Sequence, residues 1–265
     1  MTDLSWWQGL ILGIVQGLTE FLPISSSGHL VLAERFVGFK PQGLFFEVMV
    51  HVATLLSVFI AYRARIGELL RGLFRGQRSA WNYAALLILA SVPAGLAGIL
   101  LKEYFERTFH SLTSLGWQFL ITAVVLWSTK WVGRVPKQPT VGPGRALAIG
   151  IAQAIAIVPA ISRSGMTIAT GLWLGLTPAV AAEFSFLMSI IVIAGSGFLE
   201  FRHIPPGTTL LSAGLVWAFL SALVFGVIAI RLLVALLRSS RFYLFAPYCA
   251  VVGVLCLVWF GLLGR

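Results

Sequence analysis

The chain has 265 residues, of which 58% are apolar and only 11% are charged, and its mean hydropathy is +0.94. Soluble domains average about 45–50% apolar and about 25% charged residues, so this composition excludes a soluble globular enzyme and a disordered chain. The net charge of +10 could indicate a nucleic-acid partner, but the basic residues lie in short segments between apolar runs, which favours a membrane protein.

The first apolar segment, residues 4–39, is broken in its middle by Pro23 and a Ser-Ser-Ser-Gly run. Each half is shorter than the roughly 20 residues that a helix needs to cross the hydrocarbon layer. The segment therefore predicts a helix–loop–helix hairpin that enters the membrane and returns to the same side. A second broken segment, residues 146–176, contains Pro159 and a Ser-Arg-Ser-Gly run and predicts a hairpin of the same kind.

Six uninterrupted apolar runs are long enough to cross the bilayer as helices. They lie near residues 44–62, 81–101, 112–131, 178–199, 209–230 and 242–263. With the two hairpins they predict an all-α integral membrane protein, with six transmembrane helices and two re-entrant hairpins in one polytopic domain over residues 1–265.

Basic residues gather in three of the connecting segments. Segments 63–80, 130–145 and 231–241 together hold twelve Lys and Arg, whereas 102–111 and 200–208 are close to neutral. The positive-inside rule places the three basic segments in the cytoplasm. Both termini then lie outside, the first hairpin enters from outside, and the second enters from the cytoplasm.

The two halves of the sequence resemble each other at an offset of 137 residues. The run LGIVQG matches IGIAQA, and the offset pairs Gln16 with Gln153, Ser25 with Ser162, Ser27 with Ser164, and Gly28 with Gly165. Each half holds one hairpin and three spans, an odd number, which predicts inverted repeats over roughly 1–131 and 140–265. Inverted repeats with broken helices place a polar site near the midplane, where the hairpins meet.

Four charged residues fall inside hydrophobic segments: Glu20, Glu47, Arg163 and Glu183. Each charge costs about 2.5–3.5 kcal/mol at the bilayer centre, so these residues must pair, neutralise or line a wet cavity. A structural pair of Arg163 with one Glu is one interpretation of them. The other is an anion site between the two hairpins.

The tips of both hairpins have the composition of an anion site. Two helix N-termini would face one another there with free backbone N–H groups and positive dipole ends, and Arg163 adds a planar fork suited to phosphate. Hydroxyl groups and a small residue complete the set: Ser25, Ser26, Ser27, Ser162, Ser164 and Gly165. Serines at such positions also serve as plain helix N-caps.

Further residues beside the first tip suit catalysis. Ser26 and His29 lie three residues apart, which allows the contact of a nucleophile with a base in phosphoryl or acyl transfer. Glu20 could orient His29, hold a divalent cation or shuttle protons, and Gln16 could bind the same ligand. His51 is interpreted as a core histidine. The sequence has no nucleotide-binding loop and no His-Glu-x-x-His or Cys-x-x-Cys motif, which argues against an ATP-driven pump and a zinc protease.

At these residues the chain resembles the bacitracin-resistance type of undecaprenyl-diphosphate phosphatase, over essentially its whole length. The run QGLTEFLPISSSGH is similar to that family's first motif, PAISRSGMT to its second, and EFSFLMS to a further run. The resemblance implies an enzyme of the bacterial plasma (inner) membrane that releases inorganic phosphate from undecaprenyl diphosphate. Such an enzyme recycles the lipid carrier of peptidoglycan synthesis and confers bacitracin resistance.

The resemblance also assigns roles to the residues of the two motifs. Glu20, Ser26, His29 and Arg163 match catalytic and phosphate-binding positions, and Glu20 is implied as a ligand of Mg²⁺ or Ca²⁺. Gln16 takes the Glu-or-Gln position of the first motif. Apart from the resemblance, Gln16 and the tip residues are expected to bind the substrate: Ser25, Ser27, Ser162, Ser164 and Gly165. Gln16 cannot ionise, and Ala160 stands where the family usually has Gly. Whether Ser or His is the nucleophile stays open.

The expected partners are a polyprenyl diphosphate lipid and the bilayer, with no nucleic acid, and assembly as a homodimer is left open. The active site is expected to open to the extracytoplasmic side. The alternative function is a carrier or flippase for a phosphorylated lipid or an anion, because inverted repeats and broken helices also characterise carriers. Phosphate release by purified protein without a gradient separates the two functions.

Overall fold

The computed structural model describes residues 4–41, 45–100, 112–134, 138–201 and 212–262. The described residues form eleven α-helices: α1 (Trp6–Phe21), α2 (Ser26–Val37), α3 (Phe45–Ala61), α4 (Arg63–Phe74), α5 (Arg78–Leu100), α7 (Leu112–Ser128), α8 (Pro143–Ile155), α9 (Arg163–Trp173), α10 (Pro178–Phe201), α11 (Ala213–Arg238) and α12 (Phe245–Cys256). Short helical turns follow α7 (η1, Thr129–Arg134), precede α12 (η2, Phe242–Leu244) and extend it (η3, Leu257–Leu262). The prediction of an all-α protein is confirmed.

Several of these helices are long and apolar enough to cross a membrane, as the sequence predicts for a multi-pass protein. Four segments have the length and the apolar composition of a membrane span: Arg78–Leu100, Pro178–Leu199, Ala213–Arg238 and Phe242–Gly261. Helix α3 joins them as a fifth candidate when it is taken together with α4, with a bend of 79° between the two. Helices α3 and α7 have 17 residues each and therefore span only about 25 Å.

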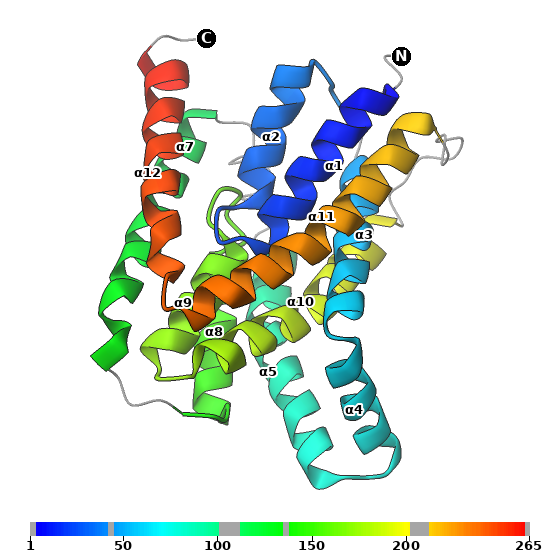
Figure 1. The fold of residues 1–265 in the computed structure, drawn as a ribbon, viewed down its shortest axis with the longest axis vertical. Helices are drawn as coiled ribbons and strands as arrows, with labels where there is room; N and C mark the ends of the chain where they lie inside the picture. Colours follow the sequence, from blue (N-terminus) through cyan, green and yellow to red (C-terminus); the bar gives the residue numbers. More distant parts are fainter. Residues whose placement is uncertain (1–3, 42–44, 101–111, 135–137, 202–211, 263–265) are drawn as a thin grey trace.

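The elements at the two ends of the molecule agree with the predicted chain path. Figure 1 shows that α1 begins and α12 ends at the same end, whereas α4 and the turn into α5 project from the opposite end. The near-neutral segment 102–111 and residues 202–208 lie outside the described residues.

The basic segment 63–80, expected as a connecting loop, is mostly helical. Its apolar residues Ile66 and Leu69 recur at helical spacing, so that one face of α4 packs against the molecule while Arg63 and Arg71 remain exposed. Segment 231–241 is likewise helical as far as Arg238, because α11 extends beyond its predicted end. The basic residues of these segments indicated connecting loops, but the regular spacing of their apolar residues makes them helical.

Helices α1 and α11 run side by side at backbone contact, in nearly the same direction (Figure 1). A Cβ atom added to Gly9 would lie 1.9 Å from the carbonyl oxygen of Gly214, and one added to Gly13 would lie 2.2 Å from that of Ala218. Gly150 on α8 meets Ala90 on α5 in the same way, at 2.4 Å. Such stripes of small residues allow membrane helices to approach closely.

We expect Gly13→Ala to destabilise the protein by about 1–3 kcal/mol, because the added methyl group would overlap the α11 backbone. Gly98→Ala on α5 is the matched control, since no atom lies within 4 Å of the added Cβ there. Thermal unfolding in detergent, followed by intrinsic fluorescence, compares the two variants. Equal unfolding midpoints would contradict the close contact of α1 and α11.

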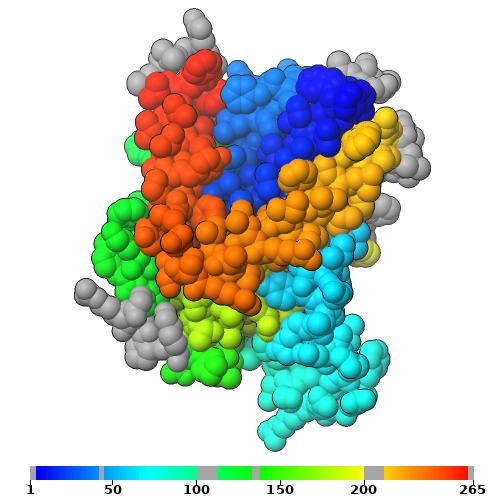
Figure 2. Space-filling view, in the orientation of Figure 1, coloured from blue at the N-terminus to red at the C-terminus, as the bar shows by residue number. Residues whose placement is uncertain are grey.

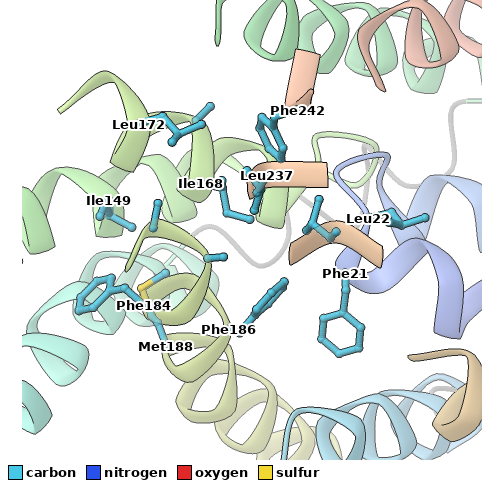
Figure 3. Packing of buried hydrophobic residues seen from close by; sticks show 14 of the residues in the cluster. Phe21, Leu22, Ile149, Ile168, Leu172, Phe184, Phe186, Met188, Leu237 and Phe242 are labelled. Carbon is cyan, nitrogen blue, oxygen red and sulfur yellow. The ribbon is translucent and has the colours of Figure 1, made fainter. Parts of the chain in front are cut away.

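The largest buried cluster lies where the end of α1 meets α8 to α11, and it holds the hairpin tips in place. Figure 3 shows this cluster around Phe21, Phe186 and Phe242. The rings of Phe21 and Phe186 meet edge to face with their centroids 5.6 Å apart. The space-filling view in Figure 2 shows how closely α11 lies over α1 in front of this core.

Candidate active site

The turns between α1 and α2 and between α8 and α9 are joined by two hydrogen bonds between side chain and backbone. The Ser25 hydroxyl donates to the carbonyl oxygen of Pro159 at 2.8 Å, and the Ser164 hydroxyl donates to that of Leu22 at 3.2 Å. Leu22 and Pro159 are themselves 137 residues apart. Each tip therefore binds the backbone of the other, as the sequence predicts for hairpins that meet.

Both tips begin their second helix with a serine N-cap. The Ser25 hydroxyl accepts a hydrogen bond from the Gly28 N–H at 3.3 Å, and the Ser162 hydroxyl accepts one from the Gly165 N–H at 3.1 Å. Ser25 has a φ of 69°, in the left-handed region, whereas the N-cap of the second tip, Ser162, has a φ of −67°. The caps leave the first N–H groups of α2 and α9 directed towards the junction of the tips.

Helix α7 holds the second tip from its other side. The Gln118 side chain accepts a hydrogen bond from the Ala160 N–H at 2.6 Å, and the Thr122 hydroxyl donates to the Ala160 carbonyl oxygen at 3.2 Å. The Ser162 N–H donates to the same Thr122 hydroxyl at 3.2 Å. The Ala160 methyl group is fully buried. The second tip thus has a fixed backbone conformation.

Glu20, near the end of α1, is the centre of the polar cluster. Its carboxylate forms an ion pair with Arg163 at the first position of α9. It also accepts hydrogen bonds from the Ser26 hydroxyl at 2.6 Å and from the Gln16 amide at 3.1 Å. Glu20 is 7% exposed, so its charge is compensated by protein groups rather than by bulk water. The pair of Arg163 with a Glu, one of the two interpretations from the sequence, is therefore present. Polar groups expected at an anion site contact the same Glu20 carboxylate.

His29 follows Ser26 by three residues on α2, but its ring contacts α12 instead of Glu20. Its Nδ1 donates to the Ser25 carbonyl oxygen at 2.7 Å, and its Nε2 lies 2.8 Å from the Tyr248 hydroxyl. Within the described residues, the side-chain partner of Ser26 is Glu20, and His29 makes no hydrogen bond to Ser26. The spacing of three residues permits the Ser–His contact expected from the sequence, but the ring is turned towards α12.

The remaining tip serines divide into two groups. Ser25, Ser162 and Ser164 are at most 4% exposed and their hydroxyls bind the tips, so they hold the site together. Ser26 and Ser27 are partly exposed and stand at the start of α2, where a ligand can reach them.

His51 was interpreted as a core residue, but it contacts the site. Its Nδ1 donates to the Glu47 carbonyl oxygen at 2.7 Å, and its Nε2 lies 3.7 Å from the Glu20 carboxylate. Together with Ser27, Glu34 and Glu47 it lines a small cavity beside α2. In the sequence, the spacing of four residues between Glu47 and His51 on one apolar helix could have indicated that both side chains face the same polar site.

Glu183, the fourth charged residue of the hydrophobic segments, lies away from the tips. Its carboxylate accepts hydrogen bonds from Arg65 at 2.8 Å and from Tyr83 at 3.1 Å. These contacts join α4, α5 and α10, so the pairing of this residue is structural.

Comparison with known proteins gives a consistent result over nearly the whole chain. Residues 9–255 match the family model described as bacitracin resistance protein BacA. The undecaprenyl-diphosphatase of Desulfosudis oleivorans is 40% identical over 96% of this chain and 98% of its own length. The proteins of the same name from Desulforapulum autotrophicum and Korarchaeum cryptofilum are 37% and 40% identical, over 95% and 93% of this chain and 97% and 96% of their own lengths.

Proposed function

The chain belongs to the bacitracin resistance protein BacA family and is an undecaprenyl-diphosphatase, and from this premise we propose that its reaction takes place where the two hairpin tips meet. The residues that carry it are Glu20, Ser26, His29 and Arg163. The observation that carries the proposal is that one buried carboxylate, that of Glu20, binds both the hydroxyl of Ser26 and the guanidinium of Arg163. Nucleophile, proton acceptor and phosphate-binding cation are thus in contact.

The proposed arrangement in the membrane has six spans and two re-entrant hairpins, related as inverted repeats, with the site open to the extracytoplasmic side. Equivalent serine caps and reciprocal hydrogen bonds at the two tips support the repeat. The basic helix α4, at the end of the molecule opposite the start of α1, supports the orientation (Figure 1). Helices α3 and α7 would complete the six spans.

Binding of the diphosphate is proposed to exchange one partner of Arg163 for another. The guanidinium would turn from Glu20 to the terminal phosphate, which it can hold with two parallel N–H donors. The capped N-termini of α2 and α9 add backbone N–H groups and the positive ends of two helix dipoles. The two helix N-termini are in place before the substrate arrives. Together with the Arg163 guanidinium they would stabilise the charge that develops on the transferred phosphoryl group.

The proposed chemical step uses the Ser26 hydroxyl that already donates to Glu20. The Ser26 oxygen attacks the terminal phosphorus, the bond from phosphorus to the bridging oxygen breaks, and the hydroxyl proton moves to Glu20. Undecaprenyl monophosphate leaves and takes the proton from Glu20. Water then gives a proton to Glu20 and attacks the phosphoserine, the bond from phosphorus to the serine oxygen breaks, and Glu20 returns the proton to that oxygen as inorganic phosphate is released. His29 remains the alternative nucleophile, provided that its Nε2 leaves Tyr248.

A divalent cation, Mg²⁺ or Ca²⁺, is proposed to bind beside Glu20. The donor set fits a hard cation, because the Glu20 carboxylate lies next to the Gln16 amide oxygen, which is buried and has no hydrogen-bond partner. Within the described residues no three His, Cys, Asp or Glu side chains could hold a metal by themselves, so substrate oxygens would complete the coordination. When bound, the cation would neutralise charge on the diphosphate.

We expect detergent-purified protein to release phosphate from undecaprenyl diphosphate without any membrane gradient. EDTA should abolish this release, and added Mg²⁺ or Ca²⁺ should restore it. Phosphate release is measured with and without chelator on the same folded preparation. Release that EDTA leaves unchanged would refute the cation, and absence of release from folded protein would refute the assigned activity.

A further inference from the structure

Tyr248, in the first turn of α12, contacts the histidine of the first motif although 219 residues separate them. Its hydroxyl lies 2.8 Å from His29 Nε2, and the two rings stack with centroids 5.6 Å apart and planes 11° from parallel. The ring of Phe119, from α7, meets the His29 ring edge to face at 5.2 Å. The imidazole is therefore held by two aromatic rings that come from neither hairpin.

The hydrogen bonds of His29 fix which ring nitrogen carries the proton. Nδ1 lies 2.7 Å from the Ser25 carbonyl oxygen, which can only accept, so Nδ1 must carry hydrogen. In the neutral ring Nε2 then presents its lone pair, and the Tyr248 hydroxyl donates to it. The nitrogen that could accept a proton or attack phosphorus is thus the one that Tyr248 binds.

Tyr248 is placed so that it can release this nitrogen. It is 46% exposed, and α12 packs mainly on α7, whereas side chains of α2 and α12 meet along one small apolar cluster. A rotation of the tyrosine about its own side-chain bonds would uncover Nε2 without moving a helix. The contact therefore orients the ring in the resting protein and leaves it accessible to substrate.

We propose that Tyr248 is a positioning residue for His29: its hydroxyl donates to Nε2, the nitrogen that the Ser25 contact leaves without a proton, and holds the ring in place until the diphosphate arrives. The proposal rests on the proposed function, because it gives His29 a part in the reaction. It assigns to α12 a role in a site whose proposed reacting groups all come from the two hairpins.

The test is Tyr248→Phe, which keeps the stacked ring and removes only the hydroxyl. We expect kcat for phosphate release to fall roughly tenfold with KM unchanged, the size of effect that one hydrogen bond to a reacting group produces. In protein labelled with ¹⁵N-histidine, the His29 Nε2 signal should shift as its hydrogen bond is lost, whereas Nδ1 should keep its proton because the Ser25 contact remains. His29→Gln identifies those signals, and Tyr243→Phe, in η2 just before α12, is the matched control.

A double variant distinguishes positioning from a general effect on the fold. If Tyr248 acts through His29, Tyr248→Phe should cause no further loss in the His29→Gln background. A full tenfold loss there would overturn the proposal, and so would an unchanged kcat and an unchanged Nε2 signal in the single variant. If the wild-type protein itself releases no phosphate, the proposed function fails instead, and the NMR comparison still decides whether the Tyr248 hydroxyl binds Nε2.

Discussion

Replacing Arg163 by alanine should lower kcat for phosphate release by about 10³-fold or more, the range over which an arginine contributes to phosphoryl transfer. The variant loses the only guanidinium in contact with Glu20 among the described residues, and with it the fork that we propose for the terminal phosphate. Arg163→Lys keeps the charge without the fork and should retain more activity than alanine, but less than the wild-type protein. Phosphate release under saturating substrate measures both.

Loss of folding must be separated from loss of catalysis in this variant. Removing Arg163 leaves a buried carboxylate without its main partner, which costs about 3–5 kcal/mol in comparable pairs. Arg163→Ala combined with Glu20→Gln removes both charges, so it should recover stability while remaining inactive. Arg71→Ala, an exposed arginine of α4, is the matched control and should keep full activity. Substantial turnover by a folded Arg163→Ala protein would refute the proposed site.

Replacing Ser26 by alanine should abolish turnover and also prevent any covalent intermediate from forming. A rapid acid quench with substrate labelled in its terminal phosphate should trap phosphoserine in the wild-type protein and nothing in Ser26→Ala. Ser239→Ala, at the exposed end of α11, should behave as wild type. Ser26 is expected to be the modified residue because its hydroxyl donates a hydrogen bond to the Glu20 carboxylate at 2.6 Å, and that carboxylate can accept the proton.

The same quench decides between the two candidate nucleophiles. Phosphohistidine is stable in base and labile in acid, whereas phosphoserine survives acid, so parallel quenches identify the modified residue. Label that is lost in acid and absent from a His29→Gln variant would transfer the nucleophilic role to His29. In that case Tyr248 would have to leave Nε2 before each turnover.

The sequence was sufficient for the parts of the fold that depend on local patterns. Apolar length predicted the long helices, and Pro23 and Pro159 marked the breaks that the structure places at the two tips. The offset between Ser25 and Ser162 predicted equivalent turns, and both residues are N-caps. These predictions were possible because the N-cap, the break and the apolar length of a helix each depend on residues that are close together in the sequence.

The details of the site depend on contacts that no local pattern contains. Tyr248 reaches His29 from α12, and His51 reaches Glu20 from α3, so their roles follow from helix packing alone. The hydroxyls of Ser25 and Ser164 looked equivalent to that of Ser26 in sequence, yet they bind backbone of the opposite tip. Which polar group faces a ligand is decided by how two tips interlock.

The two interlocked tips divide one task between them. At the offset of 137 residues, the counterpart of Ser26 is Arg163, and the counterpart of Glu20 is Ile157. Two tips like the first would bring together two carboxylates and no guanidinium, and two tips like the second would supply two guanidinium groups and no carboxylate. The proposed chemistry therefore needs two tips that differ, because the first supplies the carboxylate and the second supplies the guanidinium.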